Sequence, residues 1–295
     1  MTAPGPTGAI HDIGYRHYDG PRLGPTYIAR SLFVHSLRGA YGLGRSPRTK
    51  VMPLLLLAVM VVPALIIAAV AIISKNDKLP LEYTAYAVHL QVIVSIFVAS
   101  QAPQSVSRDL RFRVVALYFS RPLSRHAYVQ AKLLAMSAAV FVLLALPLAV
   151  LYGGALLAKM PLWHNTSGFL VAIAGAVVFA VVLSSVGLVI AAFTPRRGLG
   201  VAAVVAVLLV LAGVSGTIQG IAEHEGNYTT AGYAGLISPF TLVDGVQTWA
   251  FGAKSSTISH PHGTAGGITF VLVTIALVAA CYGLLVLRYR KVSVL

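Results

Sequence analysis

The chain has 295 residues, of which 57% are hydrophobic and only 10% are charged, and its formal net charge is +14. A soluble domain carries about 25% charged residues, so this composition excludes a soluble globular protein. Because the basic residues lie between apolar runs, we attribute the charge to membrane topology and not to nucleic-acid binding. We therefore predict an all-α integral membrane protein that contacts the lipid bilayer and no nucleic acid.

The N-terminal segment is expected to form a cytoplasmic tail and an interfacial helix. Glycine and proline punctuate residues 1–25, which show no helical period, so we expect a tail that lies on the rest of the protein, with disorder as the alternative. In residues 26–45 large apolar side chains recur at every fourth position, which favours a short helix in the headgroup layer. These side chains are Phe33, Leu37 and Tyr41. Gly42, Gly44 and Pro47 then break the helix.

Six long apolar runs follow, and none of them contains Asp, Glu, Lys or Arg. They cover approximately residues 51–73, 84–103, 133–157, 167–193, 199–220 and 267–287. Each run is long enough to cross the hydrocarbon core as a helix, which takes ~20 residues. We therefore predict a single six-span transmembrane domain over residues 51–295, preceded by the tail and interfacial helix of residues 1–50.

The lysine and arginine residues predict the orientation of these spans. With the N-terminus in the cytoplasm, eighteen of the 22 basic residues fall in cytoplasmic segments. Seven precede residue 51, six lie in residues 104–132, two lie between the fourth and fifth runs, and three follow the last run. Because the bias has the same sign at every turn, we predict a multi-pass plasma-membrane protein with both termini in the cytoplasm.

The fourth run carries a small residue at every fourth position. These residues are Ala172, Ala176, Ala180 and Ser184. Small side chains on one stripe let helix backbones approach closely, so we predict a helix packed inside the bundle or at a dimer seam. An Ala-rich composition without a packing role is the alternative.

The segment 237–252, in the long outside loop before the last run, is amphipathic. Pro239 suits the first turn of a helix. We expect Asp244 and Gln247 to face water while the large apolar side chains of the segment enter the outer leaflet. Those side chains are Phe240, Leu242, Val246 and Trp249. The segment is therefore predicted to be re-entrant or interfacial.

The chain carries no nucleotide-binding motif. It contains no G-x-x-x-x-G-K-[ST] sequence, and no segment outside the apolar runs is large enough for a nucleotide-binding domain. If ATP drives this protein, another chain binds it. We also predict no catalytic residue in this chain. No metal site is predicted either, because His260 and His262 have no cysteine or carboxylate nearby in the sequence to complete a ligand set.

Ion-coupled transport and intramembrane proteolysis are further alternatives. The runs hold no acidic residue, and His89 is the only ionisable group near the middle of one, so a hydrogen bond from His89 to a neighbouring helix is favoured over a proton relay. Residues 213–216 (GVSG) resemble the G-x-S-G of rhomboid proteases, but the last run has no histidine to act as the base. Ser215 is therefore expected to be a packing residue.

The longest basic interruption between the runs spans residues 108–132. Read as a helix, residues 109–120 carry two apolar stripes with arginines beside them. The stripes are Leu110, Val114 and Leu117, and Phe112, Val115 and Phe119. One stripe can rest on the spans, while the other is exposed within a basic rim, which is the anatomy of a protein-docking surface. An interfacial helix that binds anionic lipid is the alternative.

A second helix is predicted to follow this docking helix directly. Pro122 is expected to end the first helix and Ser124 to cap the second, which runs through Tyr128 and Lys132 into the third span. A short helix joined to a long spanning helix would act as a lever.

These residues resemble the permease subunits of ABC-2 type exporters. The family pattern places charged residues before an apolar run, then S-x-P-x-S-R, an aromatic or aliphatic position and a lysine. The corresponding segments here are Arg108-Asp109, residues 117–125, Tyr128 and Lys132. The chain differs at the family's G-T-L-E, where residues 113–116 read RVVA. Six spans and a late outside loop that begins with Ser-Pro-Phe are also similar to the family, and the composition resembles its actinobacterial members.

The resemblance implies partners and site residues. Two permeases, either two copies or a copy and a paralogue, would bind two ABC ATPase chains, and ATP and Mg would be bound by those chains and not by this one. The residues expected to couple to the ATPase are Arg108, Asp109, Arg111, Arg113, Leu117, Tyr118, Phe119, Arg121, Pro122 and Arg125. Polar residues that would border a substrate path at the seam between permeases are His89, Gln91, Gln101, Thr217 and Gln219.

The resemblance also implies a transport cycle. The chain would export a hydrophobic or amphiphilic substrate by alternating access, since its spans carry no charged residue. The alternative is a membrane scaffold or insertase-like protein without a transport cycle.

Overall fold

The computed structural model describes residues 14, 20, 23–44, 46–74, 79–112, 118, 123–194, 196–257 and 263–292. Within these ranges every regular element is a helix, which confirms the all-α prediction. Five helices are long and apolar enough to span a membrane. They are α2 (Pro47–Ser74), α7 (Arg125–Leu157), α8 (Leu162–Phe193), α9 (Arg197–His224) and α12 (Gly263–Val292). Each contains one predicted run and extends beyond it at one or both ends.

The predicted second span is not one continuous helix. It forms α3 (Ala85–His89) and α4 (Gln91–Ser105), which meet at Leu90, where ψ is 23°. No proline or glycine stands at this break. Just before the break, the His89 Nδ1 lies 2.9 Å from the carbonyl oxygen of Ala85 in the first turn of α3. The amide of Leu90 still donates to the carbonyl oxygen of Tyr86 at 3.2 Å, so the two helices follow each other without an intervening loop.

The N-terminal helix α1 (Pro25–Ala40) packs against α7. The Tyr41 hydroxyl at its end donates to the carbonyl oxygen of Ala139 at 2.7 Å. Burial raises the pKa of Tyr41 well above its ordinary value, so this hydroxyl remains a donor. The helix ends before Gly42 and Gly44, as the sequence predicts, and these two glycines turn the chain toward α2 with positive φ angles of 67° and 81°. The predicted headgroup location of α1 stays a prediction.

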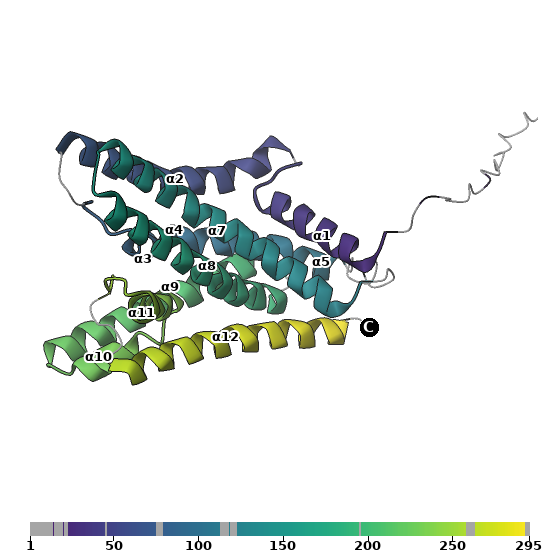
Figure 1. Cartoon of the computed structure of the whole chain (residues 1–295). Coiled ribbons are helices and arrows are strands. Elements are labelled where there is room, and N and C mark those ends of the chain that lie inside the picture. The colour runs from purple at the N-terminus through teal and green to yellow at the C-terminus, as the bar shows by residue number, and fades with distance from the viewer. Residues whose placement is uncertain are drawn as a thin grey trace, which may run out of the picture.

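Helices α7 and α8 form the centre of the bundle (Figure 1). Helix α7 packs against α1 and α2, whereas α8 packs against α4, α11 and α12. The small-residue stripe of α8 is buried throughout, which confirms that this helix lies inside the bundle. The outer faces of α2, α9 and α12 carry exposed Leu, Ile and Val side chains, as expected for surfaces in contact with lipid.

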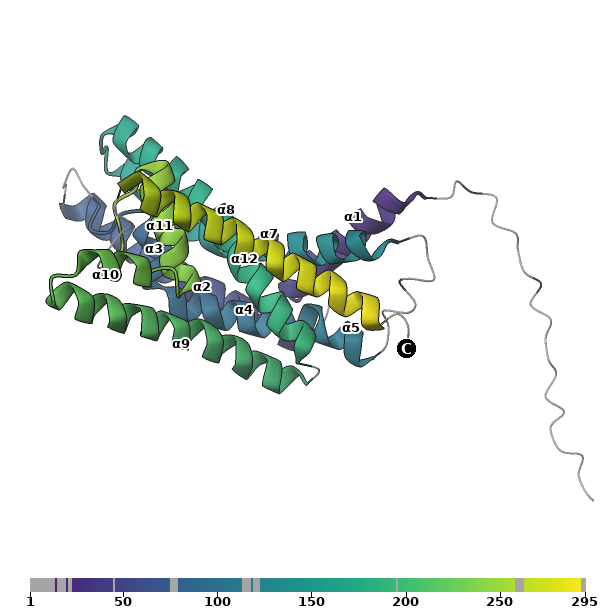
Figure 2. The ribbon, with the colours of Figure 1, turned by 90° about the horizontal axis from the view of Figure 1, so that it is seen from below.

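The bundle has two distinct ends. Helix α1, helix α5 (Ser107–Arg111) and the C-terminal turns of α12 lie at one end, which we call the α5 end (Figures 1 and 2). Helices α3 and α10 (Tyr228–Ala234) lie at the other, which we call the α10 end. The described chain therefore starts and finishes at the same end.

Helix α11 (Pro239–Phe251) was predicted correctly as a helix but with the wrong polar face. Ser238 caps it, with the amide of Phe240 3.3 Å from the Ser238 Oγ. Asp244 and Gln247, expected in water, are each 1% exposed. Helix α11 packs against α8, α9 and α12, and the loop after it folds back over Asp244, so both polar side chains and most of the apolar ones face protein. Trp249 remains 40% exposed.

Candidate functional site

The candidate site lies at the α5 end, where α4, α5 and α7 meet. The Ser107 hydroxyl donates to the carbonyl oxygen of Ala191 at 2.8 Å, which anchors the start of α5 to the end of α8. On the other side, α7 begins with the predicted cap, since the amide of Ala127 donates to the Ser124 Oγ at 3.1 Å. The first bond ties α5 to α8, and the second defines where α7 begins.

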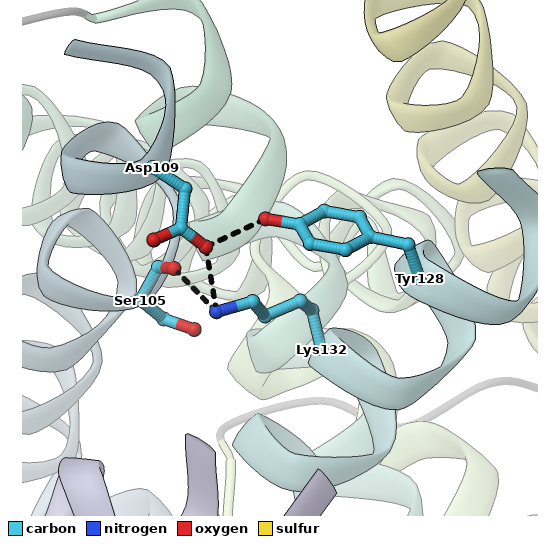
Figure 3. Close-up of polar contacts among 4 residues, drawn as sticks. All are labelled: Ser105, Asp109, Tyr128 and Lys132. Carbon is cyan, nitrogen blue, oxygen red and sulfur yellow. Dashed lines mark hydrogen bonds and ion pairs between the residues drawn. The ribbon is translucent and has the colours of Figure 1, made fainter. Parts of the chain in front are cut away.

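A buried ion pair joins the two elements. Lys132 Nζ lies 2.9 Å from Asp109 Oδ2 and 3.0 Å from the carbonyl oxygen of Ser105 (Figure 3). The Tyr128 hydroxyl donates to the same carboxylate oxygen at 2.7 Å. We call Ser105, Asp109, Tyr128 and Lys132 the Asp109 cluster. Because the Lys132 and Asp109 side chains are only 8% and 18% exposed, removal of either partner leaves a charge without its counter-ion in a poorly hydrated place.

Aromatic rings extend the Asp109 cluster to a further helix. The Tyr128 ring packs edge-on against Tyr289 of α12, with 4.9 Å between ring centroids, and lies 5.7 Å from the Tyr118 ring. Tyr289 is 1% exposed. Contacts of this geometry each stabilise by about 0.5–1.5 kcal/mol beyond their buried area. The cluster therefore connects the segment after α5, the start of α7 and the end of α12.

A cavity of about 170 Å³ opens beside the cluster. Helix α1 contributes one wall, and α4, α5 and α7 contribute the others. The polar side chains along it are His35, Ser36, Gln101, Gln104, Ser105, Asp109, Tyr118 and Lys132. Gln101 is 4% exposed, and its Nε2 donates to the Ser100 Oγ at 3.0 Å. The α5 end is thus polar and hollow next to a buried charge pair.

The structure places the residues predicted for ATPase coupling in different environments. Arg111 and Phe112 are exposed, with the Arg111 guanidinium 5.8 Å from the Phe112 ring centroid, and Arg125 is exposed at the start of α7. Tyr118 is half-buried, whereas Asp109 points inward to Lys132. Arg108 belongs to α5, but its side chain lies outside the described part of the chain. The residues that lie wholly outside it are Arg113, Leu117, Phe119, Arg121 and Pro122.

The residues predicted for a substrate path are not gathered at one place. Gln101 lines the cavity at the α5 end, whereas Gln91 is half-buried at the start of α4. Thr217 is exposed on α9 and donates to the carbonyl oxygen of Gly213 at 2.9 Å, while Gln219 is 2% exposed. His89 is exposed and bonds within its own helix, so the interpretation of a bond to a neighbouring helix is wrong.

The described residues also settle the packing of Ser215. Its hydroxyl donates to the carbonyl oxygen of Ala234 at 2.9 Å and lies 3.2 Å from the Thr241 Oγ1. Ser215 is fully buried, as expected of a packing residue that ties α9 to α10 and α11. Within the same ranges, no group of three or more His, Cys, Asp or Glu side chains could hold a metal ion.

The pairing of Asp109 with Lys132 was missed, although the sequence contains a signal for it. Asp109 is the only acidic residue between Glu82 and Glu223. A single carboxylate beside a membrane span needs a cation or several donors, and Lys132 stands at the edge of the next apolar run. No comparable sequence signal predicts that Tyr289 of the last helix contacts Tyr128.

One comparison with known proteins gives a match. A family model described as "ABC-2 family transporter protein" matches residues 70–288, which is nearly three quarters of the chain. A comparison with curated protein sequences gives no match. The family match includes all four residues of the Asp109 cluster and leaves α1 outside it.

Proposed function

The chain belongs to the ABC-2 family of transporters, and we propose that it is the permease subunit of an exporter driven by separate ATPase chains. It is a multi-pass membrane protein with several long apolar helices, and permeases of this family associate with ABC ATPase subunits. The observation that carries the proposal for this chain is the Asp109 cluster, because it links a segment outside the spans to two spanning helices.

In the proposed topology α3 and α4 together form the second of six spans, and the α5 end faces the cytoplasm. Support comes from charge, since most lysines and arginines fall in segments assigned to this side. The described start of α1 and end of α12 lie at the same end, which agrees with two cytoplasmic termini (Figure 1). In this topology α1 is the interfacial helix and α11 the re-entrant segment, held by protein contacts.

We infer that the ATPase binds the segment between α5 and α7. The exposed Arg111 and Phe112 precede this segment in the chain and the exposed Arg125 follows it, so an aromatic side chain and two basic ones stand at its ends. ATP and Mg would be bound by the ATPase alone. Movement of the segment would displace Asp109. Because Asp109 contacts Lys132 and Tyr128, the displacement would tilt α7. The contact between Tyr128 and Tyr289 would pass the motion to α12.

A second permease would pack against α9. A Cβ added at Gly213, Gly216 or Gly220 on this helix would meet no neighbouring element within 4 Å, and the last two glycines form a G-x-x-x-G motif. Glycines at this spacing let two helix backbones approach closely in a membrane. A hydrophobic or amphiphilic substrate would pass along this seam, where Thr217 is exposed.

The experiment is to purify the chain with its native neighbours and to measure ATP hydrolysis in proteoliposomes. The Asp109→Asn variant keeps the side-chain shape but leaves the Lys132 charge buried without a counter-ion, which costs about 3–5 kcal/mol. We expect the variant to retain its ATPase chains while vanadate-sensitive hydrolysis falls severalfold. The double variant Asp109→Asn, Lys132→Gln removes both charges, so it should regain thermal stability without regaining activity.

A matched control removes an ion pair that is exposed. Lys254 Nζ lies 2.7 Å from Glu82 Oε1 at the α10 end, and these side chains are 73% and 46% exposed. Glu82→Gln is therefore expected to leave hydrolysis unchanged. A wild-type chain that purifies without any ATPase would refute the exporter and favour the scaffold. An Asp109→Asn variant with normal hydrolysis would refute only the role of the cluster.

A further inference from the structure

A second crevice at the α5 end lies between the first turn of α7 and the last turns of α12. Its volume is about 400 Å³. The residues along it are Leu123, Ser124, Arg125, His126, Val286 and Arg290. The two helices come from distant parts of the chain, so this crevice is created by the fold and not by a local run of basic residues.

The crevice combines an apolar floor with a basic rim. Leu123 and Val286 are 5% and 8% exposed and form the floor. Arg125, His126 and Arg290 are exposed and form the rim, so two guanidinium charges and an imidazole lie along one edge of the crevice. An occupant that suits both parts is an amphiphile with an anionic head.

The rim histidine is held in place by α12. His126 Nδ1 lies 3.1 Å from the Tyr282 hydroxyl, and the two rings are 6.2 Å apart between centroids. When the tyrosine hydroxyl donates to Nδ1, the imidazole proton is on Nε2 and is available to an anion. The N-terminal amides of α7 add partial positive charge at the same place. Three cationic or donor groups therefore converge from two helices.

The crevice also lies at the end of the apolar run of α12, which stops at Leu287 and is followed by Arg288. Leu287 of α12 is 53% exposed and stands one turn before Arg290. An acyl chain can run along Leu287 while its headgroup meets the arginines. We propose that this crevice binds the phosphate of an anionic phospholipid. Basic pockets between spanning helices are suited to such headgroups. The proposal requires only that the chain lies in a membrane, and it shares Arg125 with the proposed ATPase-binding surface.

The test measures lipid binding to the purified full-length chain in detergent. Native mass spectrometry would compare phosphatidylglycerol with phosphatidylcholine of the same acyl chains. We expect phosphatidylglycerol to bind more tightly, and the variant Arg125→Gln, Arg290→Gln to lose about fivefold in affinity per arginine removed. If the double variant does not fold, the single variant Arg290→Gln replaces it in the same measurement, because Arg290 is exposed on the last helix.

The matched control carries the same charge change elsewhere at this end. Arg196 and Arg197 are exposed at the start of α9, a helix that also contacts α5. The variant Arg196→Gln, Arg197→Gln should keep the preference for phosphatidylglycerol. Equal losses in both double variants would show general charge attraction and overturn the proposal. Displacement of phosphatidylglycerol by an equal concentration of inorganic phosphate would assign the site to free phosphate and also overturn it.

Discussion

Three carboxylates that look alike in the sequence are stabilised in different ways. Glu82 pairs with Lys254 in the open, where water screens the charges and an ion pair contributes little to stability. Asp109 is buried against Lys132 and Tyr128. Among the described residues, the buried Asp244 accepts from hydroxyl and amide donors: the Ser256 amide at 3.0 Å, and the Ser255 and Thr257 hydroxyls, each at 3.2 Å. The contribution of each carboxylate to the stability of the fold therefore depends on its partners and its burial, since all three carry the same charge.

Removal of the Asp244 carboxylate should therefore release the loop after α11. Asp244→Ala deletes several hydrogen bonds to a charged acceptor, and each such bond contributes about 1.5–3 kcal/mol. We expect the thermal unfolding midpoint in detergent to fall by several degrees. Glu223→Ala, at an exposed position of α9, is the control and should unfold like the wild type. Equal midpoints for Asp244→Ala and the wild type would show that the loop is held by other contacts.

At the scale of helices, the sequence predicted most elements because their signals are local. Continuous apolar runs and the caps Ser124 and Ser238 depend only on neighbouring residues. The break at Leu90 was not predictable, because no proline or glycine marks it in the sequence. The burial of Asp244 and Gln247 on α11 was not predictable either. A periodic pattern shows that a helix has two faces, but the helices packed around α11 decide which of them contacts protein.

Two adjacent glycines in α7 test the closest helix contact. A Cβ at Gly154 would overlap the side chain of Ala68 on α2, whereas open space surrounds Gly153. Gly154→Ala should therefore push α2 away and lower the thermal stability. Gly153→Ala gains the same helix propensity without a clash and should be neutral or stabilising by up to about 1 kcal/mol. The comparison uses unfolding midpoints in one detergent, and equal values would show that α2 can shift without cost.

At the scale of the molecule, the site was predicted only in part. The sequence located the basic segment between the second and third spans, and Asp109 within it. The sequence could not show that Asp109 points inward or that Tyr289 joins it, because both facts depend on how α7 and α12 pack. The polar residues proposed for a path are likewise separated by their helices, since Gln101 lines a cavity at the α5 end and Thr217 faces outward from α9.

The proposed orientation can be tested with single cysteines in whole cells. Cys281 is the only cysteine and is buried, so Cys281→Ser provides a silent background. A membrane-impermeant maleimide should label Glu225→Cys, near the α10 end, and should not label Lys291→Cys until the cells are opened. Labelling of Lys291→Cys in intact cells would reverse the orientation and place the segment after α5 beyond the reach of a cytoplasmic ATPase.

Helix α7 has a mechanical property that follows from the place of its proline. Pro147 has no N–H to donate to the carbonyl of Leu143, so α7 bends most easily there. Within the predicted third span, the part before the proline runs from Leu133 to Leu146 and measures about 21 Å at 1.5 Å per residue, roughly two thirds of the ~30 Å hydrocarbon core. A rotation of a few degrees applied at Lys132 would therefore be carried through most of the membrane by one stiff segment, while the turns beyond Pro147 keep their contacts with α2 and α8.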